Sequence, residues 1–242
     1  MAKMRLDKYL ADMGAGTRSQ VKEKIRKGKV TVNGVCTRSP DCKVDTEMDV
    51  VEAEGRLIGY VEMEYYMLNK PAGVVSAAAD VHYRTVVELI ASRRRKDLYP
   101  VGRLDIDTEG LLLITNDGEL THRLLSPKKH VDKTYYVETD LPIPADARKH
   151  FAEGVTLEDG MITMPAELCQ LTERSCELTI QEGKFHQVKR MFVAEGVTVT
   201  YLKRLRMGPL QLDESLSPGA YRPLTQEELE MLQRTALQEQ ME

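Results

Sequence analysis

The segment Gly102-Arg103-Leu104-Asp105 places a carboxylate shortly before an apolar run, Leu111–Ile114. A carboxylate that a rigid scaffold holds beside a buried strand occupies a common catalytic position. It can act as a nucleophile or as a general base. Taken alone, however, an aspartate two residues after an arginine is more often half of a structural ion pair. Local sequence leaves both interpretations open.

Three acids at alternate positions, Asp105, Asp107 and Glu109, are followed by Gly110, as in the first half of a calcium-binding loop. The second half is missing, because position twelve is Asn116 where a bidentate glutamate is needed. Asp107 and Glu109 are therefore interpreted as loop-capping or surface acids. The histidines and cysteines do not have the spacing of metal or redox motifs, so we expect no metal and no cofactor.

The overall composition is that of an ordinary globular protein, with 242 residues, 42% hydrophobic and 30% charged. There is no apolar run long enough to cross a bilayer and no apolar core of signal-peptide length at the start. We therefore expect a cytoplasmic protein. Nothing indicates obligate association, so a monomer is expected.

Basic residues are concentrated at the front of the chain. Residues 1–43 carry eleven Lys or Arg and four acids, whereas the rest carries 23 and 34. A basic front end on an otherwise acidic protein indicates a module that binds a polyanion. The alternative is a solvated helix face. The cations expected at the binding surface are Arg5, Arg18, Lys22, Arg26, Lys27 and Lys29.

The front module reads as two short helices followed by a small sheet. Leu6, Tyr9 and Leu10 share one helical face, Thr17 can cap a second helix, and Asn33-Gly34 predicts a tight hairpin. This order, with the opening Arg5-Leu6-Asp7-Lys8-Tyr9-Leu10, resembles an S4 domain over residues 3–50. The resemblance implies an RNA partner but no particular reaction.

The domain boundary is expected near residue 60, giving a small domain of residues 1–60 and a larger one of residues 61–242. In the larger domain, β-rich runs alternate irregularly with helical stretches. The helices are expected near residues 85–96, 119–125, 144–153, 186–195 and 225–238. The mixed order predicts an α+β fold, with a mostly antiparallel sheet flanked by helices.

Five blocks follow one another along the larger domain. They are Leu68-Asn69-Lys70-Pro71-Ala72-Gly73, Gly102 to Gly118, Lys133-Thr134-Tyr135, Glu182-Gly183-Lys184-Phe185-His186-Gln187-Val188-Lys189-Arg190 and Pro218-Gly219-Ala220-Tyr221-Arg222-Pro223. Blocks of this length and order resemble the RsuA-type pseudouridine synthases, the type of the ribosomal small-subunit enzymes, in which an S4 domain precedes the catalytic domain. The resemblance covers nearly the whole chain.

The resemblance implies that Asp105 is the catalytic residue of a cofactor-free isomerisation. It would attack C1′ or remove the C2′ proton, and the two routes stay open. Tyr135 would stack on the flipped uracil, with Tyr136 on the opposite face as a core residue. Lys189 would pair with Asp105, and Arg190 is the alternative partner.

Two further basic features complete the expected site. Arg103 would fill the gap that the flipped base leaves in the RNA or contact a phosphate. Lys203, Arg204 and Arg206 are interpreted as an extension of the cation track along the RNA backbone or, as is more common for such a cluster alone, as a solvated basic surface.

The implied target is a uridine of small-subunit (16S) ribosomal RNA, of the uridine-516 class, within an assembly intermediate. Related synthases of large-subunit (23S) sites share these motifs and form the first alternative. The second alternative is a non-catalytic S4-type assembly factor. A carboxylate that faces RNA phosphates argues against this factor, because like charges repel.

Overall fold

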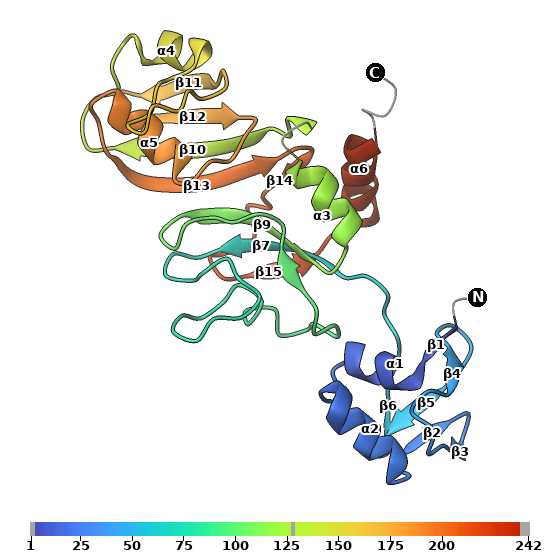
Figure 1. The fold of residues 1–242 in the computed structure, drawn as a ribbon. Coiled ribbons are helices and arrows are strands. Elements are labelled where there is room, and N and C mark those ends of the chain that lie inside the picture. Colours follow the sequence, from blue (N-terminus) through green and yellow to red (C-terminus); the bar gives the residue numbers. More distant parts are fainter. Residues whose placement is uncertain (1–2, 127–128, 238–242) are drawn as a thin grey trace. The chain divides into compact units, whose positions relative to one another are not determined.

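The computed structural model describes residues 3–126 and 129–237 (Figure 1). The chain forms two compact units. The first takes in the chain as far as Glu64 together with Ala91–Leu98, and the second contains Tyr65–Ile90 and the chain from Tyr99 onward. Residues 91–98, which the sequence analysis places in the larger domain, thus pack with the smaller unit. In the described parts of the chain, no helix is long and apolar enough to cross a membrane.

The first unit is built from two helices and short strands. The elements are β1 (Lys3–Arg5), α1 (Leu6–Asp12), α2 (Arg18–Arg26), β2 (Val30–Val32), β3 (Val35–Cys36), β4 (Lys43–Asp45), β5 (Val51–Ala53) and β6 (Arg56–Leu57). One sheet has the order β3-β2-β5-β6, and β1 pairs separately with β4. The helices bury the apolar side chains of Leu6, Tyr9, Leu10, Val21 and Ile25 against this framework.

Local signals explain where α2 and the first hairpin begin. Thr17 and Gln20 form a reciprocal capping box, which satisfies two free backbone N–H groups at the start of α2. Asn33 and Gly34 have φ angles of 53° and 77°, as a type I′ turn between β2 and β3 requires. Both features lie where the sequence predicts them.

The second unit is organised around one large sheet. Its elements are β7 (Tyr65–Lys70), β8 (Tyr99–Pro100), β9 (Glu109–Thr115), α3 (Gly118–Leu125), β10 (Lys133–Thr139), α4 (Ala147–Glu153), β11 (Glu167–Thr172), β12 (Ser175–Ile180), α5 (Gln187–Ala194), β13 (Val199–Met207), β14 (Leu210–Gln211), β15 (Tyr221–Pro223) and α6 (Gln226–Leu237). The strand order is β11-β12-β10-β13-β9-β7-β15. The named strands of this sheet pair antiparallel, apart from β13 with β9. The α+β class with a mixed, mostly antiparallel sheet is confirmed.

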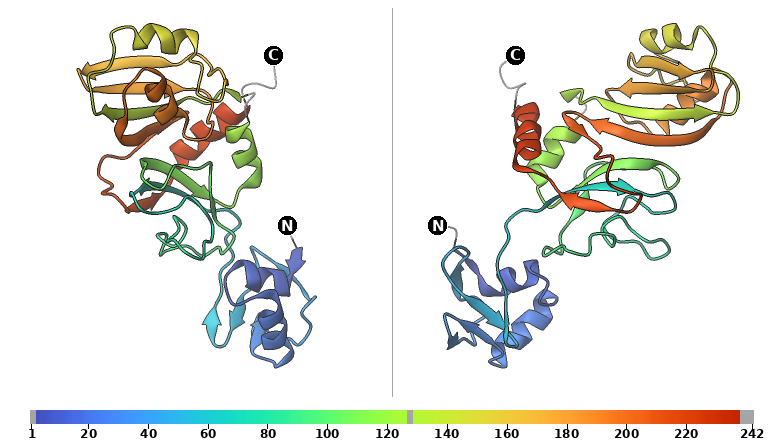
Figure 2. Two further views of the ribbon diagram at one scale, coloured as in Figure 1. Left: turned by 60° about the vertical axis from the view of Figure 1, so that its left-hand side comes forward. Right: turned by 180° about the vertical axis from the view of Figure 1, so that it is seen from behind.

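Helices cover the sheet in two groups. α3 and α6 lie side by side (Figure 2) and pack leucines, including Leu120 and Leu232, against Leu111 and Leu113 of β9. α4 and α5 meet through Phe151 and Phe192, whose ring centroids are 5.2 Å apart. These cores fix β9, which follows the loop with Asp105, and α5, which carries Lys189.

One expected helix is absent: residues 85–96 form turns. Thr85 and Glu88 do make the reciprocal bonds of a capping box. No helix follows, because Arg94 and Arg95 direct their backbone N–H groups to the Glu64 carboxylate of the first unit. Tertiary partners thus override the local helix signal.

Candidate active site

The loop that carries Asp105 is held from behind by polar groups. The Ser76 hydroxyl donates to the Leu104 carbonyl (2.8 Å) and accepts from the Leu104 N–H (3.0 Å). The Thr108 N–H donates to the Asp105 carbonyl at 3.1 Å, which closes a tight turn. The Asp105 side chain is 26% exposed, so the carboxylate lies on a braced loop and remains open to a substrate.

A fully buried lysine, Lys70, fastens the same loop. Its ammonium group donates to the carbonyls of Pro71 (3.1 Å), Ile106 (3.2 Å) and Thr108 (2.8 Å). Burial lowers the pKa of Lys70 to about 8, although the charges of nearby carboxylates oppose the shift. Lys70 lies in the first of the five sequence blocks, but its role as an anchor of the loop depends on burial, for which the signal is tertiary.

Two cationic or potentially cationic groups of the α5 region reach the carboxylate of Asp105. Lys189 Nζ lies 3.3 Å from Oδ2, and His186 Nε2 lies 3.5 Å from Oδ1. The alternative partner, Arg190, binds Glu158 instead, at 2.6 Å. Between Lys189 and Arg190, the geometry brings Lys189 to Asp105.

Asp107 also belongs to this cluster. Its Oδ1 lies 2.6 Å from Lys189 Nζ, closer than Asp105 does, and the hydrogen bond from Lys189 lowers the pKa of Asp107. The sequence interpretation of Asp107 as a loop or surface acid omits this contact. The sequence signal for this contact was the spacing of two residues between Asp105 and Asp107, because it places both carboxylates on the same loop.

Helix α5 is positioned by its buried face. Val188, Met191 and Phe192 are buried, while Lys189 retains partial exposure toward the Asp105 loop. Before the helix, His186 has a left-handed conformation with φ of 48°. This backbone conformation is uncommon for a non-glycine residue and occurs often at functional sites.

The two tyrosines of β10 lie on opposite faces, as predicted. The buried one is Tyr135, however, whereas the sequence predicts Tyr136 in the core. Tyr135 is 7% exposed and shares its face with Val137, which is fully buried. Tyr136 is only partly buried, and its hydroxyl donates to Glu138 at 2.8 Å. Tyr135 is the more buried of the two because its face of β10 is the one that points into the core. Within residues 3–126 and 129–237, no hydrogen bond or ring contact joins Tyr135 to Asp105.

The interpretation of Arg204 as part of a solvated basic surface is wrong. Arg204 is 2% exposed, pairs with Tyr135 across β10 and β13, and donates from Nε to the Leu111 carbonyl at 2.8 Å. Its Nη2 is buried without a hydrogen-bond partner among the described residues. The alternation with buried Leu202 two residues earlier was the signal for an inward side chain. Burial, followed by the charge of Arg204, also lowers the pKa of Lys133 to about 8.

Arg103 is exposed on the Asp105 loop. No ion pair of Arg103 is found within the described parts of the chain. The same parts hold no group of three or more His, Cys, Asp or Glu side chains that could bind a metal ion.

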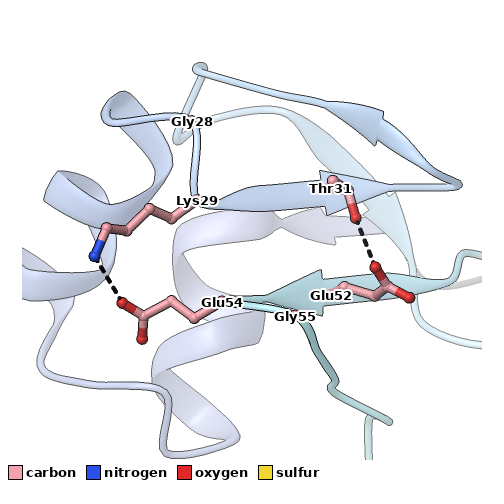
Figure 3. A pocket seen from close by; sticks show the side chains of 6 residues that line it. All are labelled: Gly28, Lys29, Thr31, Glu52, Glu54 and Gly55. Carbon is pink, nitrogen blue, oxygen red and sulfur yellow. Dashed lines mark hydrogen bonds and ion pairs between the residues drawn. The ribbon is translucent and has the colours of Figure 1, made fainter.

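The cations of the first unit differ in how far they are neutralised. Lys29 and Lys24 both bind Glu54, at 3.0 and 2.8 Å, and hold the pKa of Glu54 at about 2. Figure 3 shows Lys29 and Glu54 beside a hollow of about 430 Å³, which is also lined by Glu52 and Thr31. Glu54 lies far along the chain from both lysines, so the sequence did not reveal that it neutralises them.

The other expected RNA-binding residues fall into two groups. Arg5 and Lys22 lie 2.9 and 3.8 Å from Asp7, and Lys27 lies 2.6 Å from Glu23. Arg18 and Arg26 are exposed, and neither forms an ion pair within the described part of the unit.

The second unit carries a carboxylate paired with a lysine on a braced loop, and the first unit carries exposed cations, a combination that suits an enzyme acting on RNA. The RNA pseudouridylate synthase family matches residues 64–194, and the S4 domain matches residues 4–51. The chain belongs to the RNA pseudouridylate synthase family and carries an S4 domain. The resemblance drawn from the sequence is confirmed.

Relatives extend over nearly the full length. The chain is 47% identical to an uncharacterised RNA pseudouridine synthase of Bacillus subtilis (strain 168), covering 95% of this chain and 98% of that protein. It is 42% identical to ribosomal small subunit pseudouridine synthase A of Escherichia coli (strain K12), covering 93% and 98%. A crystal structure of a pseudouridylate synthase matches with a TM-score of 0.68 at 42% identity, covering 95% of this chain and 99% of that one.

Proposed function

We propose that this enzyme isomerises a uridine of small-subunit (16S) ribosomal RNA to pseudouridine, at a site of the uridine-516 class, with Asp105 as the catalytic residue. The observation that carries the proposal is the Asp105 carboxylate on its braced loop, 3.3 Å from Lys189 Nζ. An opposite charge at this distance attracts the carboxylate and fixes its orientation. The relatives named for the small subunit support the choice of RNA.

The reaction breaks the N1–C1′ bond, turns the uracil and forms a C5–C1′ bond. Atoms and electrons balance without an external reactant, since the proton leaves C5 and one is regained at N1. The Asp105 carboxylate serves either as the nucleophile at C1′ or as the base at C2′. Lys189 keeps this carboxylate oriented, because its ammonium group reaches both Asp105 and Asp107.

Substrate recognition is divided between the two units. The S4 unit binds RNA through exposed cations such as Arg18 and Arg26, which are free to meet phosphates. Flipping the target base costs roughly a few kcal/mol. Tyr135 is 7% exposed before RNA binds, so stacking on it, worth about 1–3 kcal/mol, requires that its ring become more exposed when the base enters. Arg103, exposed on the Asp105 loop, contacts the RNA backbone or the gap left by the base. The natural substrate is an assembly intermediate, and the enzyme acts as a monomer.

The test compares Asp105→Asn with Asp107→Asn. Asp105→Asn should bind RNA with unchanged affinity and form less than about 1% of the wild-type product, since an essential catalytic group is removed. Asp107→Asn, a carboxylate two residues away, should retain product formation within about tenfold. Pseudouridine would be mapped chemically in 16S and 23S RNA, both free and in assembling subunits.

The outcomes separate the alternatives. Product in 23S RNA alone would exclude the small-subunit target. RNA binding by the wild type with no product in either RNA would favour the non-catalytic assembly factor. Residual activity of Asp105→Asn well above 1% would remove Asp105 from the catalytic role.

A further inference from the structure

We infer that Phe185 is a stacking platform for an unpaired base that directly neighbours the target uridine in the substrate RNA. This inference rests on the proposed action of Asp105 on RNA. It assigns a substrate-binding role to a residue that the chemistry of the reaction does not require. Phe185 precedes α5 on the segment that brings His186 and Lys189 to Asp105.

The first observation is exposure. Phe185 is 72% exposed, although burying a phenylalanine side chain contributes about 1.5–3 kcal/mol to folding. Its ring is stacked on the His186 imidazole, with centroids 3.8 Å apart and an angle of 20° between the planes. Two flat rings in this arrangement form a surface that matches the face of a nucleobase.

The second observation is that hydrogen bonds hold the segment in place despite its exposure. Arg190 donates to the Phe185 carbonyl at 3.3 Å while it binds Glu158. The Lys184 ammonium group donates to the Ile162 carbonyl at 2.7 Å, and the Lys184 backbone N–H donates to Gln187 Oε1 at 2.9 Å. A preformed surface loses little conformational entropy on binding, which favours a role in recognition.

The third observation is continuity with the catalytic group. His186 Nε2 lies 3.5 Å from Asp105 Oδ1, so one face of the stacked pair adjoins the carboxylate at which the target sugar must lie. Neighbouring nucleotides of a strand follow within a few ångströms of that sugar. An unpaired base next to the target therefore meets the exposed ring of Phe185.

The ligand class follows from the chemistry of the rings. Bases of single-stranded or looped RNA stack on aromatic side chains, and the gain is tolerant of base identity because every base has a π face. The occupant is thus a flanking nucleobase of the RNA.

The experiment is a double-mutant cycle in which Phe185 is changed on the enzyme and one nucleotide is changed on the RNA. It uses the full-length enzyme and a stem-loop that the wild type converts. The variants are Phe185→Ala and Phe185→Trp, with Leu171→Ala as the control for loss of an exposed apolar side chain (51% exposed). Each is measured on the intact stem-loop and on two stem-loops with an abasic nucleotide on the 5′ or the 3′ side of the target. Thermal unfolding verifies that the variants fold.

Phe185→Ala should raise KM and Kd roughly 10–100-fold, the value of one stacked base, and leave kcat within about threefold. Phe185→Trp should restore binding, and Leu171→Ala should behave as wild type. At one of the two abasic positions, the loss of the base should raise the Kd of the wild type by the same factor as Phe185→Ala does. The Kd of Phe185→Ala should not rise further at that position, because the stacking contact is already lost.

Additive losses at both abasic positions would overturn the inference. An unchanged Kd for Phe185→Ala, or a loss in kcat alone, would also overturn it. Because the wild type must first convert the intact stem-loop, a failure of the proposed activity is visible separately from a failure at Phe185.

Discussion

At the scale of single residues, Lys70 links the core of the second unit to the active-site loop. Its ammonium group is fully buried and bound by three carbonyls, two of which belong to Ile106 and Thr108 on either side of Asp107. No carboxylate is in direct contact with it within the described parts of the chain. The Lys70 ammonium group therefore gives up its contact with water to hold the Asp105 loop.

This arrangement predicts a pH dependence of stability. The pKa of Lys70 is about 8 in the folded chain and 10.5 in the ordinary lysine. Between these values the unfolded chain binds more protons, so the contribution of Lys70 to the free energy of unfolding rises with pH. The wild type should gain stability relative to Lys70→Met from pH 8 to about 10.5, with a constant difference below pH 8. Urea unfolding at a series of pH values measures this, and a flat or falling difference above pH 8 would contradict it.

At the scale of elements, the junction of β9 with β13 decides the shape of the sheet. It is the parallel pair in a sheet otherwise made of antiparallel pairs, and its register joins Lys203 with Glu109 and Arg204 with Gly110. Gly110 has a φ of 99°, and a Cβ there would lie 2.3 Å from the Arg204 carbonyl oxygen. The junction therefore requires glycine both for its backbone conformation and for the close approach of the two strands.

Gly110→Ala should destabilise the second unit well beyond the cost of a left-handed backbone. Gly160→Ala is the matched control, since Gly160 has a φ of 80° but nothing within 4 Å of the added Cβ. The free energy of unfolding of the control should fall by about 1–2 kcal/mol, which is the strain of the left-handed conformation alone. Gly110→Ala should lose at least about 2 kcal/mol more, because backbone atoms must move apart. Equal losses in denaturant unfolding would show that the approach of β13 imposes no constraint.

At the scale of the whole molecule, Ala91–Leu98 binds into the first unit although both flanking segments belong to the second. Arg95 is the centre of this attachment. Its guanidinium group donates to the Tyr60 hydroxyl (3.1 Å) and the Val61 carbonyl (3.2 Å), and lies 3.7 Å from Asp12. The S4 unit thus depends on a segment about thirty residues beyond its own end.

Arg95→Ala should therefore weaken the first unit and leave the second intact. Hydrogen bonds to charged groups contribute about 1.5–3 kcal/mol each to stability. Hydrogen exchange should show faster exchange in α1 and β5, with the amides of β9 and β10 unchanged. Arg94→Ala is the control, since that side chain is exposed. Uniform loss of protection in both units, or none in the first, would contradict the assignment of this segment.

The sequence by itself determined the family, the fold class and the identity of the motif residues. The signals are local: the capping box at Thr17, the turn at Asn33-Gly34, and the motif around Asp105. Each depends on neighbours within a few residues, so residue types and spacing are enough to reveal it. Helix positions near 119–125 and 186–195 followed from the same periodicity and match α3 and α5 closely.

Only the tertiary structure decided which charged groups meet. It brought Lys189 to Asp105 and Asp107, placed Glu54 between Lys24 and Lys29, and buried Arg204 beside Tyr135. It also replaced the helix expected at residues 85–96 with turns. The physical reason is common to all four cases: the energies come from contacts between segments far apart in the chain, which local propensity and periodicity do not contain.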